Sequence, residues 1–180
     1  MKLISSMTLL LAVATGPRAF AEAPLREGHP GDDFVVREEM VPMRDGVRLF
    51  TLILVPKQCG EGLPILLERT PYDKSGLSRS EVSLRRPEPA TRPEVATWFA
   101  QRGYAVVMQD CRGRYRSGGE FTKYLHEAED GRDTLAWIVG QPWCNGRVGT
   151  MGVSYGAHVQ LAMACLAPPG LRCMFTDSGG

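Results

Sequence analysis

The sequence has no excess of charge of either sign and no long apolar run after its first residues. It holds 21 Lys and Arg residues against 20 Asp and Glu, a formal net charge of +1 at pH 7. A balance of this kind gives no electrostatic footprint for a nucleic acid or an anionic membrane surface. We therefore expect no nucleic-acid partner, and no membrane span beyond the N-terminal segment.

Paired cysteines of the kind that hold a metal are also missing. The five cysteines are Cys59, Cys111, Cys144, Cys165 and Cys173, and none forms a C-x-x-C pair. We therefore expect no zinc site, and no motif calls for a cofactor. The odd count leaves at least one thiol free or paired outside the chain, and the sequence does not choose between buried thiols and disulfides.

The first 21 residues have the layout of a cleaved export signal. Lys2 precedes an apolar run from Leu3 to Ala14, and Ala19-Phe20-Ala21 is a small-x-small cleavage site. The run is short for a membrane span, which needs roughly 20 residues. We expect cleavage after Ala21, which leaves 180 − 21 = 159 residues, and a periplasmic or secreted protein.

The rest of the chain alternates between segments typical of strands and of helices. Residues 22–33 indicate a flexible lead-in. Strands are predicted over 34–43, 47–55, 63–68, 104–110, 147–153 and 171–177, and helices over 94–102, 126–141 and 157–167. This alternation predicts an α/β fold with a mostly parallel central sheet.

Local signals support several of these boundaries. Arg44-Asp45-Gly46 predicts the turn of an antiparallel N-terminal hairpin. Thr91 and Glu94 have the spacing of a capping box, and Gly103 closes the helix that follows. Residues 69–92 are polar and predict a long loop. The chain stops directly after its last predicted strand, so we expect residues 34–180 to be the N-terminal part of a larger domain.

A G-x-S-x-G motif, Gly152 to Gly156, lies between a predicted strand and a predicted helix. In α/β-hydrolases this motif is the nucleophile elbow, a strained turn that presents a serine, and its glycines allow close backbone approach. The motif therefore makes Ser154 a candidate nucleophile. A serine of this kind needs two donors for the developing oxyanion. The backbone N–H of Tyr155 is one candidate, and the hydroxyl of Tyr72, in the loop after an earlier strand, is the other.

The same stretch has a second interpretation as a variant dinucleotide loop. Gly149, Gly152 and Gly156 would cradle the phosphates, and Asp177 would bind a ribose about 20 residues later. The spacing departs from G-x-G-x-x-G, and such a loop usually follows the first strand of its domain. We therefore prefer the nucleophile elbow.

Four segments follow one another along the chain and carry a resemblance to a known family. They are MRDGVRLFTLILVP, ILLERTPYDK, FAQRGYAVVMQDCRGRYRSGGEF and EAEDGRDTLAWIVGQPWCNGRVGTMGVSYGA. Together they resemble the CocE/NonD hydrolases, α/β-hydrolases related to Xaa-Pro dipeptidyl-peptidases, α-amino acid ester hydrolases and cocaine esterase. The resemblance runs from about residue 36 to 180. It implies a serine hydrolase that cleaves acyl ester or amide bonds, Xaa-Pro peptides included, through an acyl-enzyme.

The resemblance also implies roles for single residues. Ser154 matches the family nucleophile, Tyr155 the residue whose N–H faces the oxyanion, and Tyr72 the tyrosine whose hydroxyl completes the oxyanion hole. The segment 110–121 matches a motif that lies beside the site and is mainly structural.

Charged residues near that motif have a structural interpretation. For Arg112 and Arg114 we expect ion pairs that pin the loop, with Asp110 or Glu120 as partners. Two further carboxylates, Asp130 and Asp133, are interpreted as helix-face or capping groups.

The base and the acid of a catalytic triad are missing from this sequence. In this fold they follow the nucleophile in the order acid, then histidine. After Ser154 the only histidine is His158, four residues along the same predicted helix, and we expect its side chain to point away from the elbow. His126 and His29 precede the serine. Asp177 follows too soon to be the family's acid. We therefore expect the isolated chain to be inactive.

Two explanations of the missing base remain open. In the first, the chain is part of a true hydrolase acting on a small ester, amide or short peptide, and a missing C-terminal half or a second chain carries the remainder. A homo-oligomer is the other partner that we consider. In the second, the chain is a non-catalytic remnant or an acyl-ligand-binding subunit.

Overall fold

The computed structural model describes residues 33–57, 62–73 and 91–179. The expected signal peptide, nearly all of the lead-in, Cys59 and most of the predicted long loop lie outside these ranges. The elements are β1 (Phe34–Pro42), β2 (Arg48–Pro56), β3 (Leu63–Thr70), α3 (Arg92–Ala100), β4 (Ala105–Asp110), α4 (Glu127–Val139), β5 (Cys144–Val153), α5 (Tyr155–Ala164) and β6 (Leu171–Asp177).

The strands form one sheet in the order β1-β2-β4-β3-β5-β6. The pairs β1–β2 and β2–β4 are antiparallel, and β3–β4, β3–β5 and β5–β6 are parallel. The turn of the first hairpin lies at Arg44-Asp45-Gly46, where Gly46 has a φ of +85° and donates its N–H to the Met43 carbonyl at 2.9 Å. The predicted mostly parallel sheet with an antiparallel hairpin is confirmed.

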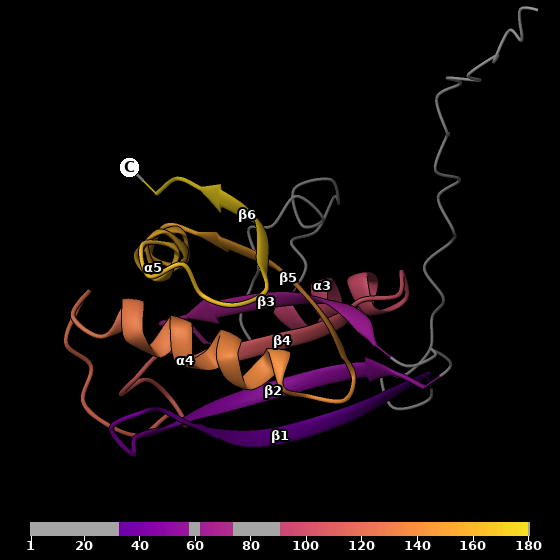
Figure 1. Cartoon of the computed structure of the whole chain (residues 1–180), viewed down its shortest axis with the longest axis horizontal. Helices are drawn as coiled ribbons and strands as arrows, with labels where there is room; N and C mark the ends of the chain where they lie inside the picture. Colours follow the sequence, from indigo (N-terminus) through magenta and orange to yellow (C-terminus); the bar gives the residue numbers. More distant parts are fainter. Residues whose placement is uncertain (1–32, 58–61, 74–90, 180) are drawn as a thin grey trace, which may run out of the picture.

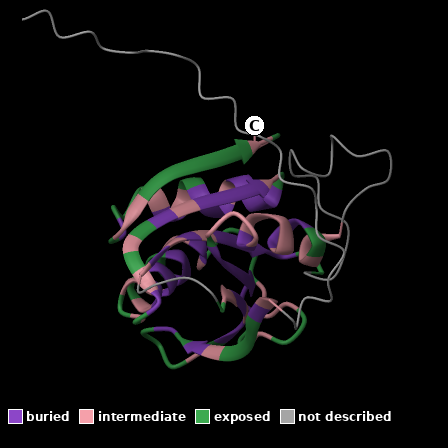
Figure 2. Cartoon of the chain, turned by 90° about the vertical axis from the view of Figure 1, so that its right-hand side faces the viewer, coloured by how far each residue is buried: buried purple, intermediate pink, exposed green. Residues whose placement is uncertain are grey.

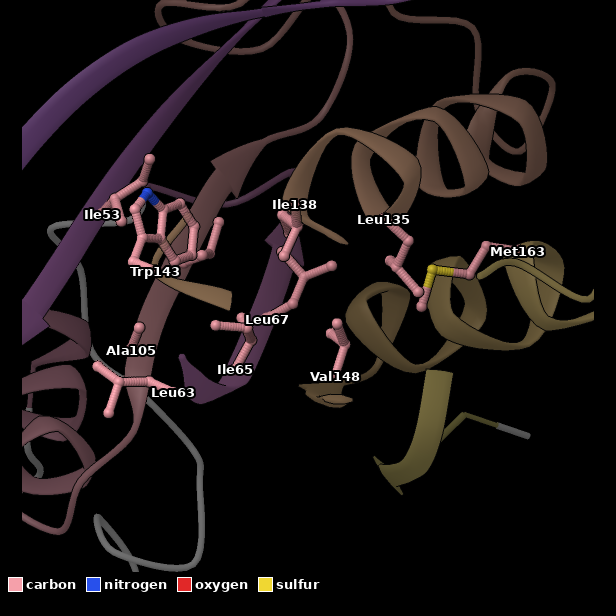
Figure 3. Close-up of a cluster of buried hydrophobic side chains, with 11 residues drawn as sticks. Ile53, Leu63, Ile65, Leu67, Ala105, Leu135, Ile138, Trp143, Val148 and Met163 are labelled. Atoms are coloured by element: carbon pink, nitrogen blue, oxygen red, sulfur yellow. The ribbon is translucent and has the colours of Figure 1, made fainter. Parts of the chain in front are cut away.

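Helices cover both faces of this sheet, with α4 and α5 on one face and α3 on the other (Figure 1). Successive residues of β4 point to opposite faces: Val107 packs in the cluster under α4, whereas Val106 and Met108 pack under α3. Figure 3 shows the first cluster, in which Leu135 of α4 and Met163 of α5 lie over the sheet. The strands thus have apolar side chains on both faces, as expected for a covered parallel sheet.

The capping box predicted at α3 is present. The Thr91 Oγ1 accepts the Glu94 N–H at 3.4 Å, and the Glu94 carboxylate accepts the Thr91 N–H at 2.7 Å. The chain leaves the helix through Gly103, which has a φ of +85°.

Some boundaries differ from the prediction, and two strands are longer because tertiary contacts extend them. β3 continues through Arg69 and Thr70, which pair with Gln109 and Asp110 of β4, although polarity predicted a loop there. β5 begins at Cys144, three residues early, where it pairs with β3. α5 occupies 155–164 instead of 157–167.

The strand β6 lies at the margin of the sheet and is the most exposed of the six (Figure 2). In the described ranges no strand pairs with its outer edge. None of the helices in these ranges has the length and apolar character needed to cross a membrane.

Candidate active site

Ser154 lies on a sharp turn between β5 and α5. Its φ of 58° and ψ of −120° are unusual for a residue with a side chain. The Ser154 N–H donates to the Asp177 carbonyl of β6 at 2.9 Å, and the Ser154 carbonyl accepts the Ala157 N–H at 2.9 Å. The strained turn is therefore held from both sides, and the expected strand–turn–helix context is present.

Gly152 allows α5 to start this close to β5. A Cβ atom at position 152 would lie 2.6 Å from the carbonyl oxygen of Gly156. Contacts this short involve backbone that cannot move away, so only glycine fits. At Gly156 an added Cβ would meet the Arg69 carbonyl at 3.7 Å, an ordinary contact, so the first glycine of the motif is under the stronger constraint.

Gln160 braces the same turn, and sequence reasoning did not single it out. Its amide oxygen accepts the Thr150 hydroxyl at 2.7 Å. Its amide nitrogen donates to the carbonyls of Gly156 at 3.0 Å and Phe175 at 3.1 Å. One buried side chain thus joins β5, α5 and β6. The sequence offered one signal for this role, a glutamine within a mostly apolar helical run.

Tyr72 and Ser154 meet although they are 82 positions apart in the sequence. The Tyr72 hydroxyl lies 3.3 Å from Ser154 Oγ, within hydrogen-bond distance. The ends of β3 and β5 bring them together, because parallel neighbours end at the same edge of a sheet. The Tyr72 N–H donates to Thr70 Oγ1 at 3.0 Å, which fixes the start of this loop.

Arg114 also supports the Tyr72 loop, but not in the way predicted. Its Nε donates to the Pro71 carbonyl at 2.9 Å, and its guanidinium lies 5.1 Å from the centre of the Phe121 ring. No salt bridge to Arg114 is found within the described ranges, so the expected pairing with Asp110 or Glu120 is wrong for this residue. A backbone carbonyl and an aromatic face take the place of a carboxylate.

Tyr155 places both its backbone and its side chain at the site. It opens α5, and N–H groups in the first turn of a helix have no intrahelical partner. The Tyr155 side chain is buried, with its hydroxyl 3.0 Å from Glu127 Oε1. Burial, reinforced by the negative charge of Glu127, raises the pKa of the Tyr155 phenol above its ordinary value, so the phenol remains a hydrogen-bond donor at neutral pH.

These residues surround a hollow of about 460 Å³ beside the turn. Its walls include Tyr72, Arg114, Tyr124, Ser154 and His158. Lys123 adds a second cationic side chain, and the described residues that line the hollow include no carboxylate.

The histidines have different surroundings. His158 is among the residues that line the hollow with Ser154, and its ring centre lies 5.2 Å from that of Tyr124. The aromatic neighbour holds the imidazole at this side of α5. The described part of the chain shows no hydrogen bond between His158 and Ser154, whose Oγ pairs with Tyr72. His126 is the N-cap of α4 and is not part of the hollow's lining.

Arg112 is ion-paired, as predicted, but with other partners. Its Nε donates to Asp130 Oδ2 at 3.0 Å, and its Nη1 donates to Asp45 Oδ2 at 2.7 Å. The Asp130 hydrogen bond raises the pKa of Arg112, and the Arg112 guanidinium lowers the pKa of Asp45. Asp110 and Glu120, which lie near Arg112 in the sequence, were the wrong candidates. The fold instead brings the hairpin turn and α4 to this arginine.

Asp130 and Asp133 lie on α4, in agreement with their interpretation as helix carboxylates. Each nevertheless binds an arginine from elsewhere in the chain: Asp133 Oδ1 accepts from Arg44 Nη2 at 2.7 Å. The Arg44 hydrogen bond lowers the pKa of Asp133. Together with the Arg112 pair, this contact fastens α4 to the first hairpin.

The cysteines and Asp177 are the remaining residues that the sequence made candidates for other chemistry. Within the described ranges no group of three or more His, Cys, Asp or Glu side chains is placed to hold a metal ion. Cys111, Cys144, Cys165 and Cys173 are free thiols. The Asp177 side chain accepts a hydrogen bond from Ser178 Oγ at 2.9 Å. The Asp177 backbone carbonyl accepts the Ser154 N–H.

Comparison with known proteins supports a hydrolase. Residues 45–180 match the X-Pro dipeptidyl-peptidase (S15 family). The chain is 40% identical over 146 residues to cocaine esterase of Rhodococcus sp. (strain MB1 Bresler), covering 80% of this chain and 23% of the esterase.

Two solved structures resemble this one. An α-amino acid ester hydrolase is similar at 33% identity and a TM-score of 0.64, over 93% of this chain and 28% of that one. A CocE/NonD family hydrolase from Staphylococcus aureus is similar at 29% identity and a TM-score of 0.65, over 78% and 27%. The predicted α/β-hydrolase fold and the CocE/NonD resemblance are confirmed, and the chain spans about a quarter of the length of these relatives.

Proposed function

This chain belongs to the X-Pro dipeptidyl-peptidase (S15) family, and from that premise we propose that it forms the nucleophile-bearing part of a serine hydrolase for acyl esters or amides. The observation that carries the proposal is the 3.3 Å distance between the Tyr72 hydroxyl and Ser154 Oγ, at a strained strand-to-helix turn. The two groups come from different strands and meet at the sheet edge where α/β folds bind ligands.

In the proposed reaction Ser154 Oγ attacks the carbonyl carbon of the substrate and gives its proton to a histidine. The carbonyl oxygen becomes negatively charged and accepts hydrogen bonds from the Tyr155 N–H and the Tyr72 hydroxyl. The tetrahedral intermediate then collapses, and the histidine protonates the leaving alcohol or amine. Water, activated by the same histidine, hydrolyses the acyl-enzyme and restores the serine.

We place the histidine and its orienting acid outside these 180 residues. Within the described ranges Ser154 Oγ has Tyr72 as its hydrogen-bond partner and no imidazole is bonded to it. A serine without a base remains a weak nucleophile at neutral pH. That observation also supports the second candidate, an acyl-ligand-binding subunit in which Tyr72 and Ser154 bind a ligand without cleaving it.

An ester-hydrolysis experiment distinguishes the candidates. p-Nitrophenyl acetate turnover is measured for the chain alone and with the remaining hydrolase domain supplied, fused or in trans. We expect near-background turnover alone and restored turnover in the completed protein. Restored turnover should vanish in Ser154→Ala and persist in Thr97→Ala, which removes a hydroxyl from α3, away from the hollow.

Other outcomes of this experiment would change the assignment. Ligand binding without turnover in the completed protein would favour the binding subunit. Turnover by the 180 residues alone that disappears in Ser154→Ala would contradict an external base, and His158, which lines the hollow, would be the first residue to test.

We also propose that the protein is exported and that its mature form begins at Glu22. The proposal rests on the charged start, the apolar run and the Ala19-Phe20-Ala21 site. N-terminal sequencing of periplasmic or secreted material tests it, and Met1 retained in that material would contradict it.

A further inference from the structure

The hydroxyl of Tyr155 bonds to two segments that are distant from it in the sequence. It donates to Glu127 Oε1 at 3.0 Å and accepts the backbone N–H of Tyr124 at 2.9 Å. The Tyr155 side chain is 6% exposed and Glu127 is 3% exposed. A buried hydroxyl that both donates and accepts joins the elbow helix to the start of α4 and to the loop before it.

The backbone of Tyr124 has a conformation that is unfavourable for a tyrosine. Its φ of 67° lies in the left-handed region, which is sterically unfavourable for a residue with a Cβ atom. Its ring stacks on that of Tyr155, with centres 4.9 Å apart and planes inclined by 11°. Since Tyr124 also lines the hollow, the contacts that keep it in this conformation shape the wall next to Ser154.

Glu127 is itself fixed on its other side. Its second carboxylate oxygen lies 3.2 Å from Arg69 Nη2, and its carbonyl accepts from Arg69 Nη1 at 3.0 Å. Arg69 is 2% exposed. Glu127 is the first residue of α4, where the helix dipole also favours a carboxylate. The hydroxyl of Tyr155 therefore bonds to an anchored, charged acceptor.

We propose that Glu127 and the Tyr155 hydroxyl are positioning residues that hold Tyr124 in place and so set the shape of the ligand pocket beside Ser154. Neither group needs to touch the reacting atoms: Glu127 acts on Tyr155, and Tyr155 acts on the backbone of Tyr124. This role rests on the proposed function for its meaning as a substrate pocket, although the hydrogen-bonded chain can be tested separately.

Amide hydrogen exchange in the 180-residue chain tests the hydrogen-bonded chain directly. Tyr155→Phe keeps the ring and removes the hydroxyl, so exchange at the Tyr124 N–H should become about tenfold faster. Glu127→Gln keeps an acceptor but loses the charge, so we expect a smaller increase at the same amide. The Val107 amide in central β4 reports global stability, and Tyr104→Phe, which removes a phenol hydroxyl near α3, is the matched control.

An unchanged Tyr124 exchange rate in Tyr155→Phe would overturn the proposal, and so would an equal increase at Val107, which would show a role in global stability alone. An unchanged Tyr124 exchange rate in a folded Glu127→Gln variant would show that Glu127 has no positioning role. If Glu127→Gln does not fold, Tyr155→Phe decides the question.

A second measurement tests whether the position of Tyr124 affects ligand binding beside Ser154. Ser154 is labelled with two fluorophosphonates, one with a bulky aromatic arm and one with a short alkyl arm, in the protein with its remaining domain supplied. Tyr155→Phe should raise the half-saturating concentration of the bulky probe about fivefold or more and that of the short probe much less, because only the bulky arm reaches the Tyr124 wall. A changed maximal rate with unchanged saturation would overturn the positioning role. If neither probe labels the wild-type serine, the proposed function fails while the exchange result stands.

Discussion

Gly152 occupies a position in the elbow where an added methyl group would collide with backbone. The Gly152→Ala Cβ would lie 2.6 Å from the Gly156 carbonyl oxygen, so β5 and α5 would have to separate. We expect a loss of about 3 kcal/mol in the free energy of unfolding, measured by urea denaturation. The matched control is Gly140→Ala, where φ is −77° and the nearest atom would lie at 3.5 Å.

For that control we expect a change within about 0.5 kcal/mol. Equal stability of the two variants would show that α5 can shift away from β5 at little cost. The constraint on the first glycine of the motif would then have to come from function instead of packing.

The hydroxyl of Tyr72 is predicted to act only when charge develops on the substrate oxygen. Tyr72→Phe should lower kcat by about 10²–10³-fold, the usual cost of one oxyanion donor, with little change in KM. The side chain is 42% exposed, so thermal unfolding should not change. Steady-state kinetics on a p-nitrophenyl ester in the completed protein measure the effect, with Tyr104→Phe as the control. Wild-type kcat in Tyr72→Phe would reduce this tyrosine to a packing role.

Residue patterns along the chain predicted that Ser154 and Tyr72 lie close together. They did not predict the contacts of the residues around them. A motif between a strand and a helix places the serine, and parallel strands bring the tyrosine loop to the same edge. The partners of Arg112 and the contact of the His158 ring with Tyr124 depend on which segments meet in three dimensions. Nothing in the local sequence encodes that information.

At the scale of elements, β3 has a buried carboxylate that makes stability depend on pH. Glu68 accepts from Arg92 Nε of α3 at 3.0 Å. Burial raises the pKa of Glu68 above its ordinary value of 4.5, although Arg92 opposes the shift. Between the unfolded and the raised folded pKa the folded state binds more protons, so stability falls as the pH rises through that window.

Glu68→Gln should remove this contribution, because an amide oxygen still accepts from Arg92 but does not ionise. We expect the slope of unfolding free energy against pH above 4.5 to become less negative in the variant, since each pKa unit corresponds to about 1.4 kcal/mol. Urea denaturation between pH 4.5 and 7.5 measures it. Glu129→Gln, on the exposed side of α4, is the control; parallel curves for wild type and Glu68→Gln would contradict the prediction.

The elements themselves could be predicted well wherever local patterns determine them. Apolar runs, the Asp-Gly turn and the Thr91–Glu94 box gave the strands, the hairpin and the start of α3. The end of β3 could not be predicted, because Arg69 is polar and yet buried. It enters the sheet because Gln109 Oε1 and the Glu127 carbonyl accept hydrogen bonds from its guanidinium, and the Glu127 carboxylate forms an ion pair with it.

At the scale of the whole molecule, β6 leaves an apolar margin in contact with solvent. Phe175 is 50% exposed, its neighbour Met174 in β6 is also exposed, and so is Leu161 of α5. In the described ranges no strand pairs with the outer edge of β6. Such an edge can pair with another copy of the chain, so we expect concentration-dependent self-association.

Phe175→Lys should reduce this association, because a charge at the edge opposes strand pairing. Sedimentation velocity over a tenfold concentration range measures it, and a shift of most of the protein to the monomer is expected. Val36→Lys, at an exposed position of β1 on the opposite margin, should leave association unchanged. Equal effects of the two lysines would indicate a general effect of charge and not pairing through β6.

The hydrogen bond from the Ser154 N–H to the Asp177 carbonyl has a consequence for biosynthesis. The ribosome must add 177 − 154 = 23 residues after the serine before this acceptor exists. β5 and then β6 join the sheet outward from β3 in the order in which they are translated. A nascent chain therefore carries Ser154 on an incomplete turn until β6 has left the exit tunnel.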